Sequence, residues 1–175
     1  MTTAIMPPQR HEAAAYYFSY INRVPPGDVR TILERQHADV LQLLEAIPDA
    51  KGSHRYAPEK WSVSEVVNHL SDTERMLSFR AFWFARGFDT ALPSFEQDIA
   101  AEHAGAAAHS LRHHVEEFGA VRAATVNLFR HLPGEAWERS GIASGNPFTV
   151  RALAFIIAGH VEHHVAILRE RYGVA

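Results

Sequence analysis

The sequence predicts an all-α protein built as a four-helix bundle, and three observations support this fold class. Four stretches repeat their apolar residues at the spacing of an amphipathic helix. No stretch carries a convincing strand pattern. The connection between the second and third helices, from Gly87 to about Ala107, has about 20 residues and is far longer than most links in a compact bundle. We therefore expect a helix order other than simple up-down-up-down.

The N-terminal part of the chain is expected to lead into the bundle. Residues 1–10 are predicted to be a flexible tail, and residues 11–175 a single domain. The tyrosine-rich segment from Glu12 to Asn22 predicts a short helix or an extended segment that packs across the domain. Pro25-Pro26-Gly27 ends this lead-in.

The first two long helices have clear start signals. Asp28 is a good N-cap for the first, which continues until Pro48. The second begins with the capping box Ser62-Val63-Ser64-Glu65 and runs to about Arg86. His69 lies at one edge of its apolar face, about 100° from the centre. There it could reach a neighbouring helix, or it could be a hydrogen-bonded histidine at the core boundary.

The third helix is predicted from about Ser110 to His131, and Pro133-Gly134 ends it. Several histidines lie in or near this helix without a spacing that converges on one point, and we expect them on the surface. They are His103, His109, His113, His114 and His131.

The closing helix is predicted from Phe148 to Gly173. Thr149 can cap its start, and Gly173 can adopt the left-handed conformation that ends a helix. Its apolar residues form one stripe, which comprises Leu153, Ile157, Val161, Val165 and Leu168.

Two imidazoles in this apolar stripe need a physical explanation. His160 and His164 lie inside the stripe, whereas His163 points about 100° to its side. A buried polar atom without a partner costs about 1–3 kcal/mol. At the i, i+4 spacing both rings can reach one metal ion at about 2.0–2.1 Å. The alternative is a pair of core histidines that bond to carbonyls, carboxylates or water, because two ligands alone do not make a metal site.

Two known metal motifs do not fit the sequence. Glu34 and His37 form an ExxH pair like those of di-iron carboxylate bundles, but the closing helix offers only histidines in place of a second inward ExxH. We therefore predict a solvated face for Glu34 and His37. The residue after His160 is Val161, where the zinc protease motif HExxH requires glutamate.

The composition excludes several classes of protein. With 47% hydrophobic and 21% charged residues, the chain is ordinary for a soluble globular protein. The net charge is −3 and no basic cluster contains interleaved aromatics, so we expect neither nucleic acid nor a membrane as partner. The absence of cysteine limits metal ligands to histidine, carboxylate and water. The N-terminus lacks a signal-peptide pattern and the longest apolar run is too short for a membrane span, so a cytoplasmic location is expected.

Two groups of residues resemble a known family. Trp61-Ser62 followed by Val66 and His69, together with the run Gly159-His160-xx-His163-His164, is similar to the DinB-like superfamily, which includes proteins of the bacillithiol transferase type. The tyrosine-rich lead-in, the long connection and the helix lengths fit as well. The resemblance implies a four-helix bundle with a divalent metal ion, commonly nickel or zinc. Its ligand positions match His69, His160 and His164 in this chain, which supplies the third ligand.

Three neutral imidazoles on a divalent ion would leave at least one coordination position open, as in catalytic sites. The family contains bacillithiol transferases and mycothiol-dependent isomerases, so the resemblance implies transfer of a small-molecule thiol to an electrophilic substrate. Two alternatives stay open: a metal-dependent hydrolase that uses an activated water, and a metal-binding or stress-associated bundle without turnover.

The sequence identifies no general base. Glu65 is expected to be occupied as a helix cap. Asp72 and Glu74 could assist the ligands, and Arg80 could bind an acidic substrate group, although each is otherwise explained as a charge at the surface or bundle edge. The apolar side of the second helix, formed by Phe79, Phe82 and Trp83, makes a homodimer an expectation to test.

Overall fold

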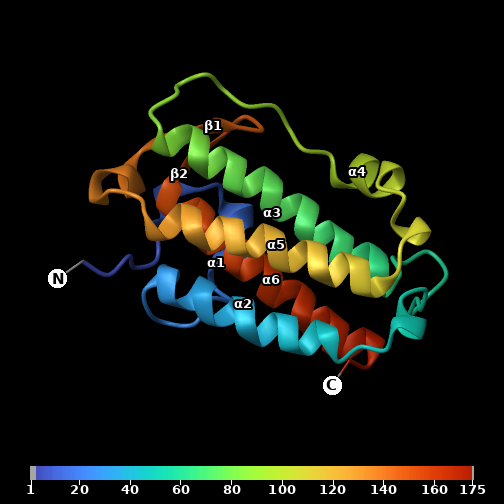
Figure 1. Cartoon of the computed structure of the whole chain (residues 1–175). Helices are drawn as coiled ribbons and strands as arrows, with labels where there is room; N and C mark the ends of the chain where they lie inside the picture. The colour runs from blue at the N-terminus through green and yellow to red at the C-terminus, as the bar shows by residue number, and fades with distance from the viewer. Residues whose placement is uncertain (1–2, 175) are drawn as a thin grey trace.

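The computed structural model describes residues 3–174 and contains four long helices that pack as a bundle (Figure 1). These are α2 (Val29–Glu45), α3 (Val63–Ala85), α5 (Leu111–Arg130) and α6 (Val150–Tyr172). The shorter helices are α1 (Phe18–Ile21) and α4 (Gln97–His103), and a hairpin is formed by β1 (Ser140–Ala143) and β2 (Asn146–Thr149). Single 3-10 turns occupy Arg10–Glu12, Ala15–Tyr17, Asp49–Lys51, Ala106–Ala108 and Gly134–Glu138.

The helix order is not simple up-down-up-down. Helices α3 and α2 each pack against both α5 and α6, so they occupy opposite corners of the bundle. The colours of Figure 1 show that α3 and α5 run in one direction, and α2 and α6 in the other. The long connection carries the chain from the end of α3 back to the end where α3 began. The prediction drawn from this connection is confirmed.

The predicted start and stop signals are confirmed. Asp28 caps α2 by accepting a hydrogen bond from the Arg30 amide at 3.0 Å. Ser62 and Glu65 form the expected capping box at the start of α3. Thr149 accepts a hydrogen bond from the amide of Ala152, and Gly173 ends α6 with φ 64° and ψ 38°.

The hairpin was not predicted, and the expectation of no strands is wrong at this point. Ser140 pairs with Thr149 and Ala143 with Asn146, so each strand has only four residues. The turn between them, Ser144 and Gly145, has positive φ angles of 51° and 72°. Strands of this length are too short to show an alternating pattern in the sequence, although the turn residues themselves are visible there.

The lead-in segment packs across α6, as predicted. The carboxylate of Glu12 is buried and accepts hydrogen bonds from Thr149 at 2.8 Å and from Arg151 at 2.7 and 3.0 Å. Gly159 allows the backbone of Tyr20 to approach α6, because a Cβ atom there would lie 2.1 Å from the Tyr20 carbonyl oxygen.

The predicted flexible tail contacts the start of α2 through two described hydrogen bonds. The Thr3 carbonyl accepts one from Arg30 Nη2 at 2.9 Å. The carbonyl of Ile5 accepts a hydrogen bond from the Val29 amide at 3.2 Å. Residues 1–2 of this tail and Ala175 lie outside the described residues. The flexible tail and the single domain over residues 11–175 remain predictions.

Helix α6 is long and apolar enough, by length and composition, to cross a membrane. However, 72% of its most apolar window is buried inside the bundle. Burial as a core helix therefore accounts for its apolar composition.

A buried polar network links all four long helices. Arg122 of α5 donates two hydrogen bonds to the Glu74 carboxylate of α3, both at 2.7 Å, and one to Gln36 Oε1 of α2 at 2.6 Å. Gln36 Nε2 then donates to the Ala158 carbonyl at 3.0 Å and to the Glu162 carboxylate at 2.7 Å, both on α6. Glu74 is 2% exposed and Arg122 is fully buried, so the network replaces water for both charges.

We expect the Arg122→Met variant to be strongly destabilised, because it leaves the carboxylate of Glu74 buried without its partner. Breaking one side of a buried ion pair costs about 3–5 kcal/mol. For a chain of this length, the melting temperature should fall by about 10 °C. Thermal unfolding followed by circular dichroism measures this change.

The matched control is Arg130→Met. Arg130 pairs with Glu34 at 3.0 Å, but both side chains are about half exposed, so its loss should cost no more than about 1 kcal/mol. The double variant Glu74→Leu, Arg122→Met removes both charges and should recover part of the stability. Equal melting temperatures for Arg122→Met and Arg130→Met would contradict the prediction.

Candidate metal centre

Three histidines from two helices meet between α3 and α6. His69 lies in the second turn of α3, and His160 and His164 lie one turn apart on α6. The ring centroids are 5.0 Å apart for His69 and His160, 4.9 Å for His69 and His164, and 4.6 Å for His160 and His164. All three side chains are buried. We call these residues the histidine triad.

The separations within the triad match those of ligands that share one ion. The Nε2 atoms of His69 and His160 are 3.1 Å apart. Two nitrogens that each lie about 2.0–2.1 Å from one ion are about 3.0–3.4 Å apart. One candidate ligand atom from each of the three residues can be chosen so that all lie within 4.8 Å of one another. Within the described residues, this is the only group of three or more potential ligands that meets this distance.

Hydrogen bonding within the protein satisfies the triad only in part. A hydrogen bond between His69 and His160 would explain the 3.1 Å contact. The Nδ1 atom of His164, however, is buried and has no hydrogen-bond partner among the described residues. An orphaned buried nitrogen beside two other imidazoles fits a site built to bind an additional group.

Burial keeps the triad uncharged at neutral pH. It lowers the pKa of His69 to about 4, an effect that the Asp98 carboxylate of α4 opposes. Burial, followed by the neighbouring His69 and His163, lowers the pKa of His164 to about 3. The pKa of His160 is likewise lowered well below 6.5, first by burial and then by the other two members of the triad. The neutral imidazole is the form that binds metal.

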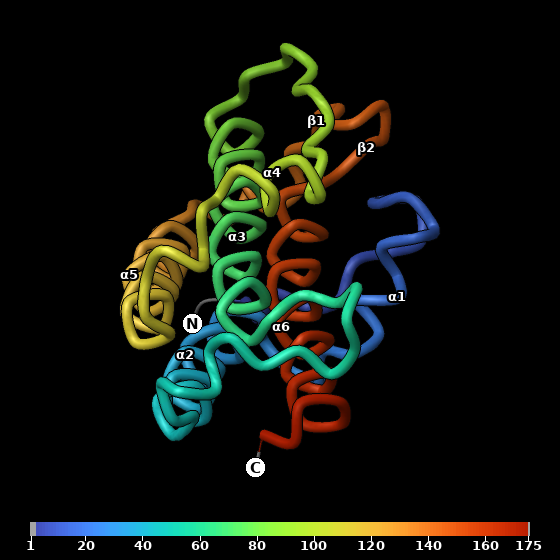
Figure 2. Tube along the Cα trace, turned by 90° about the vertical axis from the view of Figure 1, so that its right-hand side faces the viewer, coloured from blue at the N-terminus to red at the C-terminus, as the bar shows by residue number. Residues whose placement is uncertain are grey.

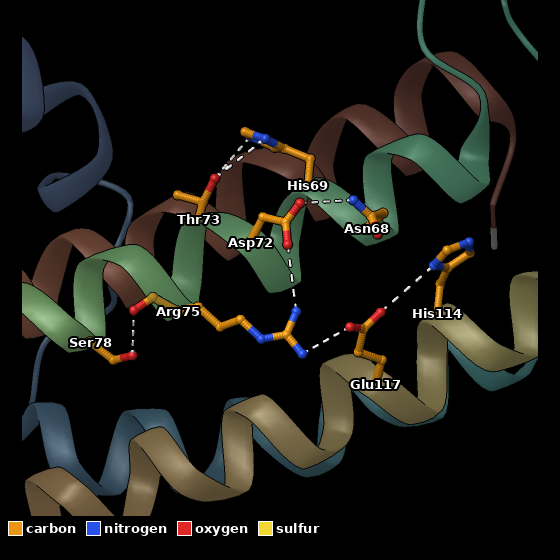
Figure 3. A network of polar contacts seen from close by, with 8 residues as sticks. All are labelled: Asn68, His69, Asp72, Thr73, Arg75, Ser78, His114 and Glu117. Atoms are coloured by element: carbon orange, nitrogen blue, oxygen red, sulfur yellow. Dashed lines mark hydrogen bonds and ion pairs between the residues drawn. The ribbon is translucent and has the colours of Figure 1, made fainter. Parts of the chain in front are cut away.

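Other side chains hold the triad in place. The Oγ1 atom of Thr73, one turn after His69 on α3, lies 3.3 Å from His69 Nδ1 and 3.4 Å from Nε2 (Figure 3). The indole of Trp61 packs on His69 with a centroid distance of 4.7 Å. The ring of Tyr20 lies edge-on to His160 at 5.5 Å. The two rings thus contact two members of the buried triad.

A cavity of about 240 Å³ borders the triad at His164. Its walls include the aromatic side chains of Tyr56, Trp61 and Tyr172. The connection between α2 and α3, which contributes Tyr56 and Trp61, passes in front of α6 in Figure 2 before α3 begins. A small molecule in this cavity would therefore lie against one of the candidate ligands.

The other histidines lie outside the triad, and four of the five that were predicted at the surface are exposed. His163 is half-buried, and its ring packs on Tyr20 at 5.5 Å. His103, His109, His113 and His131 are exposed. The surface prediction is wrong for His114, which is 1% exposed and whose Nε2 bonds to the Ala106 carbonyl at 2.9 Å. The reason is that the turn Ala106–Ala108 folds back over the start of α5.

The charged residues considered as site residues have other partners. Glu65 caps α3, as predicted. The Asp72 carboxylate accepts a hydrogen bond from Asn68 at 2.9 Å and contacts Arg75 at 3.5 Å (Figure 3). The Glu34 and His37 side chains are not buried, and Glu34 pairs with Arg130 on the surface, as predicted.

Two charged residues are not at the surface or bundle edge. Glu74 is buried in its ion pair with Arg122. Arg80 is 3% exposed and donates to the Pro93 carbonyl and to Ser144 Oγ, both at 2.9 Å, which fastens the long connection to the hairpin. The interpretation of these two residues as charges at the surface or bundle edge is wrong, because Glu74 finds its partner on α5 and Arg80 finds its partners in the long connection and the hairpin.

Sequence reasoning did not assign Thr73, Tyr20 or Trp61 to the site. The i, i+4 spacing of His69 and Thr73 could have indicated their contact. The contacts of Tyr20 and Trp61 depend on how two connecting segments fold over α6 and α3, which no periodicity encodes.

Comparison with known proteins identifies relatives of this architecture. YfiT from Bacillus subtilis, described as a probable metal-dependent hydrolase with an unusual four-helix bundle topology, is 18% identical with a TM-score of 0.71. The match covers 96% of this chain and 94% of YfiT. A mycothiol-dependent maleylpyruvate isomerase is 14% identical with a TM-score of 0.65, and the match covers 78% of this chain but 58% of the isomerase. These similarities show a shared fold.

The sequence itself matches a family model. No curated protein matches the chain. The model of the DinB superfamily matches residues 32–168, which include the whole histidine triad and most of the bundle. The chain therefore belongs to the DinB superfamily.

Proposed function

We propose that the protein is a metal-dependent enzyme that transfers a low-molecular-weight thiol to an electrophilic small molecule. We further propose that His69, His160 and His164 hold one divalent ion, either nickel or zinc. The observation that supports this most strongly is the triad itself, in which three buried imidazoles from two helices place their ligand atoms within 4.8 Å of one another.

The donor set suits a divalent ion at a catalytic site. Three imidazole nitrogens match the preferences of zinc and nickel, and three protein ligands leave a position open. When bound, such an ion supplies Lewis acidity and lowers the pKa of a coordinated thiol or water. The chain contributes ligands that stay neutral, aromatic rings that exclude water, and a cavity beside His164 for the substrate.

Two reactions are supported by different relatives. The isomerase depends on mycothiol, which favours a thiol as the cosubstrate. YfiT, which aligns over almost its full length, favours hydrolysis of an ester or amide as the second candidate. A third candidate is a bundle in which the ion links α3 to α6 without turnover.

The decisive experiment compares metal content and turnover in the same preparations. Protein purified without a histidine tag should contain about one nickel or zinc per chain by elemental analysis. The metal-loaded protein should conjugate bacillithiol, mycothiol or cysteine to monochlorobimane, and chelation should abolish the reaction. His160→Ala should lose both metal and turnover, because two remaining imidazoles bind an ion weakly.

The control variant is His131→Ala, which removes an exposed histidine outside the triad and should leave metal and turnover unchanged. Metal-dependent cleavage of p-nitrophenyl acetate without thiol conjugation would favour the hydrolase. Bound metal that raises the melting temperature, without turnover in either assay, would favour the linking role. A metal content of zero after loading would refute all three candidates.

Thr73 should contribute to metal affinity by orienting His69. When Nε2 of His69 faces an ion, Nδ1 carries the proton and can donate it to Thr73 Oγ1, which is 3.3 Å away. Losing such a partner of a ligating histidine typically weakens metal binding about 10- to 100-fold. We therefore expect Thr73→Val to bind zinc at least about tenfold more weakly in a competition titration with a chelator, and Thr73→Ser to bind normally.

The control for this prediction is Thr125→Val. Thr125 is also buried, but its hydroxyl donates to the Val121 carbonyl within α5. Its replacement should not change the affinity for zinc. Unchanged affinity in Thr73→Val would show that the hydroxyl does not orient His69.

The expectations about partners and location stay proposals. We propose a cytoplasmic protein with neither nucleic acid nor a membrane as partner, which cell fractionation can test. Phe79 and Phe82 are 50% and 37% exposed, and we propose this side of α3 as the contact of a homodimer. Light scattering should then give twice the chain mass, and Phe79→Ser should reduce it to one chain.

A further inference from the structure

We propose that the cavity beside His164 binds a neutral, single-ring apolar group of the electrophilic substrate. This inference rests on the proposed function, because it concerns the part of the substrate that does not react. One member of the triad, His164, forms part of the wall of this cavity.

The size of the cavity limits what it can hold. Its volume of about 240 Å³ is below the range of about 300–1,000 Å³ that is typical of sites for drug-sized ligands. A larger groove of about 490 Å³ lies between α3 and α5 beside Phe79, but none of the triad residues lines it. The cavity at His164 is therefore the better candidate for the substrate, because it borders a candidate metal ligand although the groove beside Phe79 is larger.

The walls of the cavity are mostly apolar and aromatic. The lining includes the aromatic residues Tyr56, Trp61 and Tyr172 and the aliphatic residues Val66 and Ile167. Aromatic walls favour a flat ring, which they can contact edge-on or face-on. Glu59 and Lys60 are both exposed and carry opposite charges, so the rim does not select strongly for an anion or a cation.

The aromatic walls are fixed before any ligand binds. The hydroxyl of Tyr172 donates to the Trp61 carbonyl at 2.6 Å, and the Tyr56 ring lies edge-on to Tyr172 at 5.0 Å. Burial, together with Tyr56, raises the pKa of Tyr172 to about 12, so this donor stays protonated. Arg55 holds the same segment by donating to the Lys60 carbonyl at 2.6 Å and by pairing with Glu65. Walls that are already ordered lose little freedom when a ring enters.

Two small chelators test this inference on the metal-loaded protein. Acetohydroxamate and benzohydroxamate bind a metal through the same group, but only the second carries a ring. In isothermal titration calorimetry, benzohydroxamate should bind wild-type protein at least about tenfold more tightly, because its ring leaves water for an apolar cavity. Ile167→Trp, which fills the cavity, should abolish this difference and leave the affinity for acetohydroxamate unchanged.

The control is Ile142→Ala, which removes an exposed apolar side chain of the hairpin and should keep the preference for benzohydroxamate. Equal affinities of the two chelators for wild-type protein, or an undiminished preference in Ile167→Trp, would overturn the inference while leaving the metal site intact. If neither chelator binds protein that is shown to contain metal, the metal has no free coordination position. That result would refute both this inference and the proposed function.

Discussion

The bundle depends on the contact between Arg122 and the groups that surround it. A guanidinium with no exposed surface is tolerated only where the protein provides partners for its donors, here Glu74 and Gln36. Because Gln36 also reaches the Ala158 carbonyl, the network fixes α2, α3, α5 and α6 at one level. Ala158 precedes His160 by two residues, so the same network sets the position of α6 where the triad forms. A core that keeps only its hydrophobicity and volume loses its unique arrangement before it loses stability, so the directional bonds of this network add to the specificity of the packing.

The histidine triad is the second constraint, and it explains the unusual composition of α6. A helix with 72% of its most apolar window buried has no structural need for His160 or His164. Burial lowers the pKa of both imidazoles and keeps them neutral, and the buried Nδ1 of His164 has no hydrogen-bond partner among the described residues, which favours an additional bound group. Tyr20 approaches this face closely because Gly159 carries no side chain. The rings of Tyr20 and Trp61 therefore pack on the triad, and Trp61 also lines the cavity that borders it at His164.

The four long helices could be predicted from the sequence because their signals are local. N-caps such as Asp28, Ser62 and Thr149 mark where helices begin, and the spacing of apolar residues marks the helices themselves. The triad residues could be proposed as one site only through resemblance to a family, since His69 lies on another helix and its distance from His160 depends on packing. The burial of Glu74, Arg80 and His114 could not be predicted, because each finds its partner in a distant or irregular segment. Helix α4 and the hairpin were missed because they are too short for a clear period.

The separation of His69 from His160 by 91 positions has a consequence during protein synthesis. When the ribosome has made α3, the nascent chain holds one histidine of the triad, and the other two follow only with the final helix. The intervening segments can begin to fold locally, but long-range contacts of this kind form late. A nascent chain that ends before α6 therefore holds one imidazole of the triad and cannot form the site, whatever group that site binds.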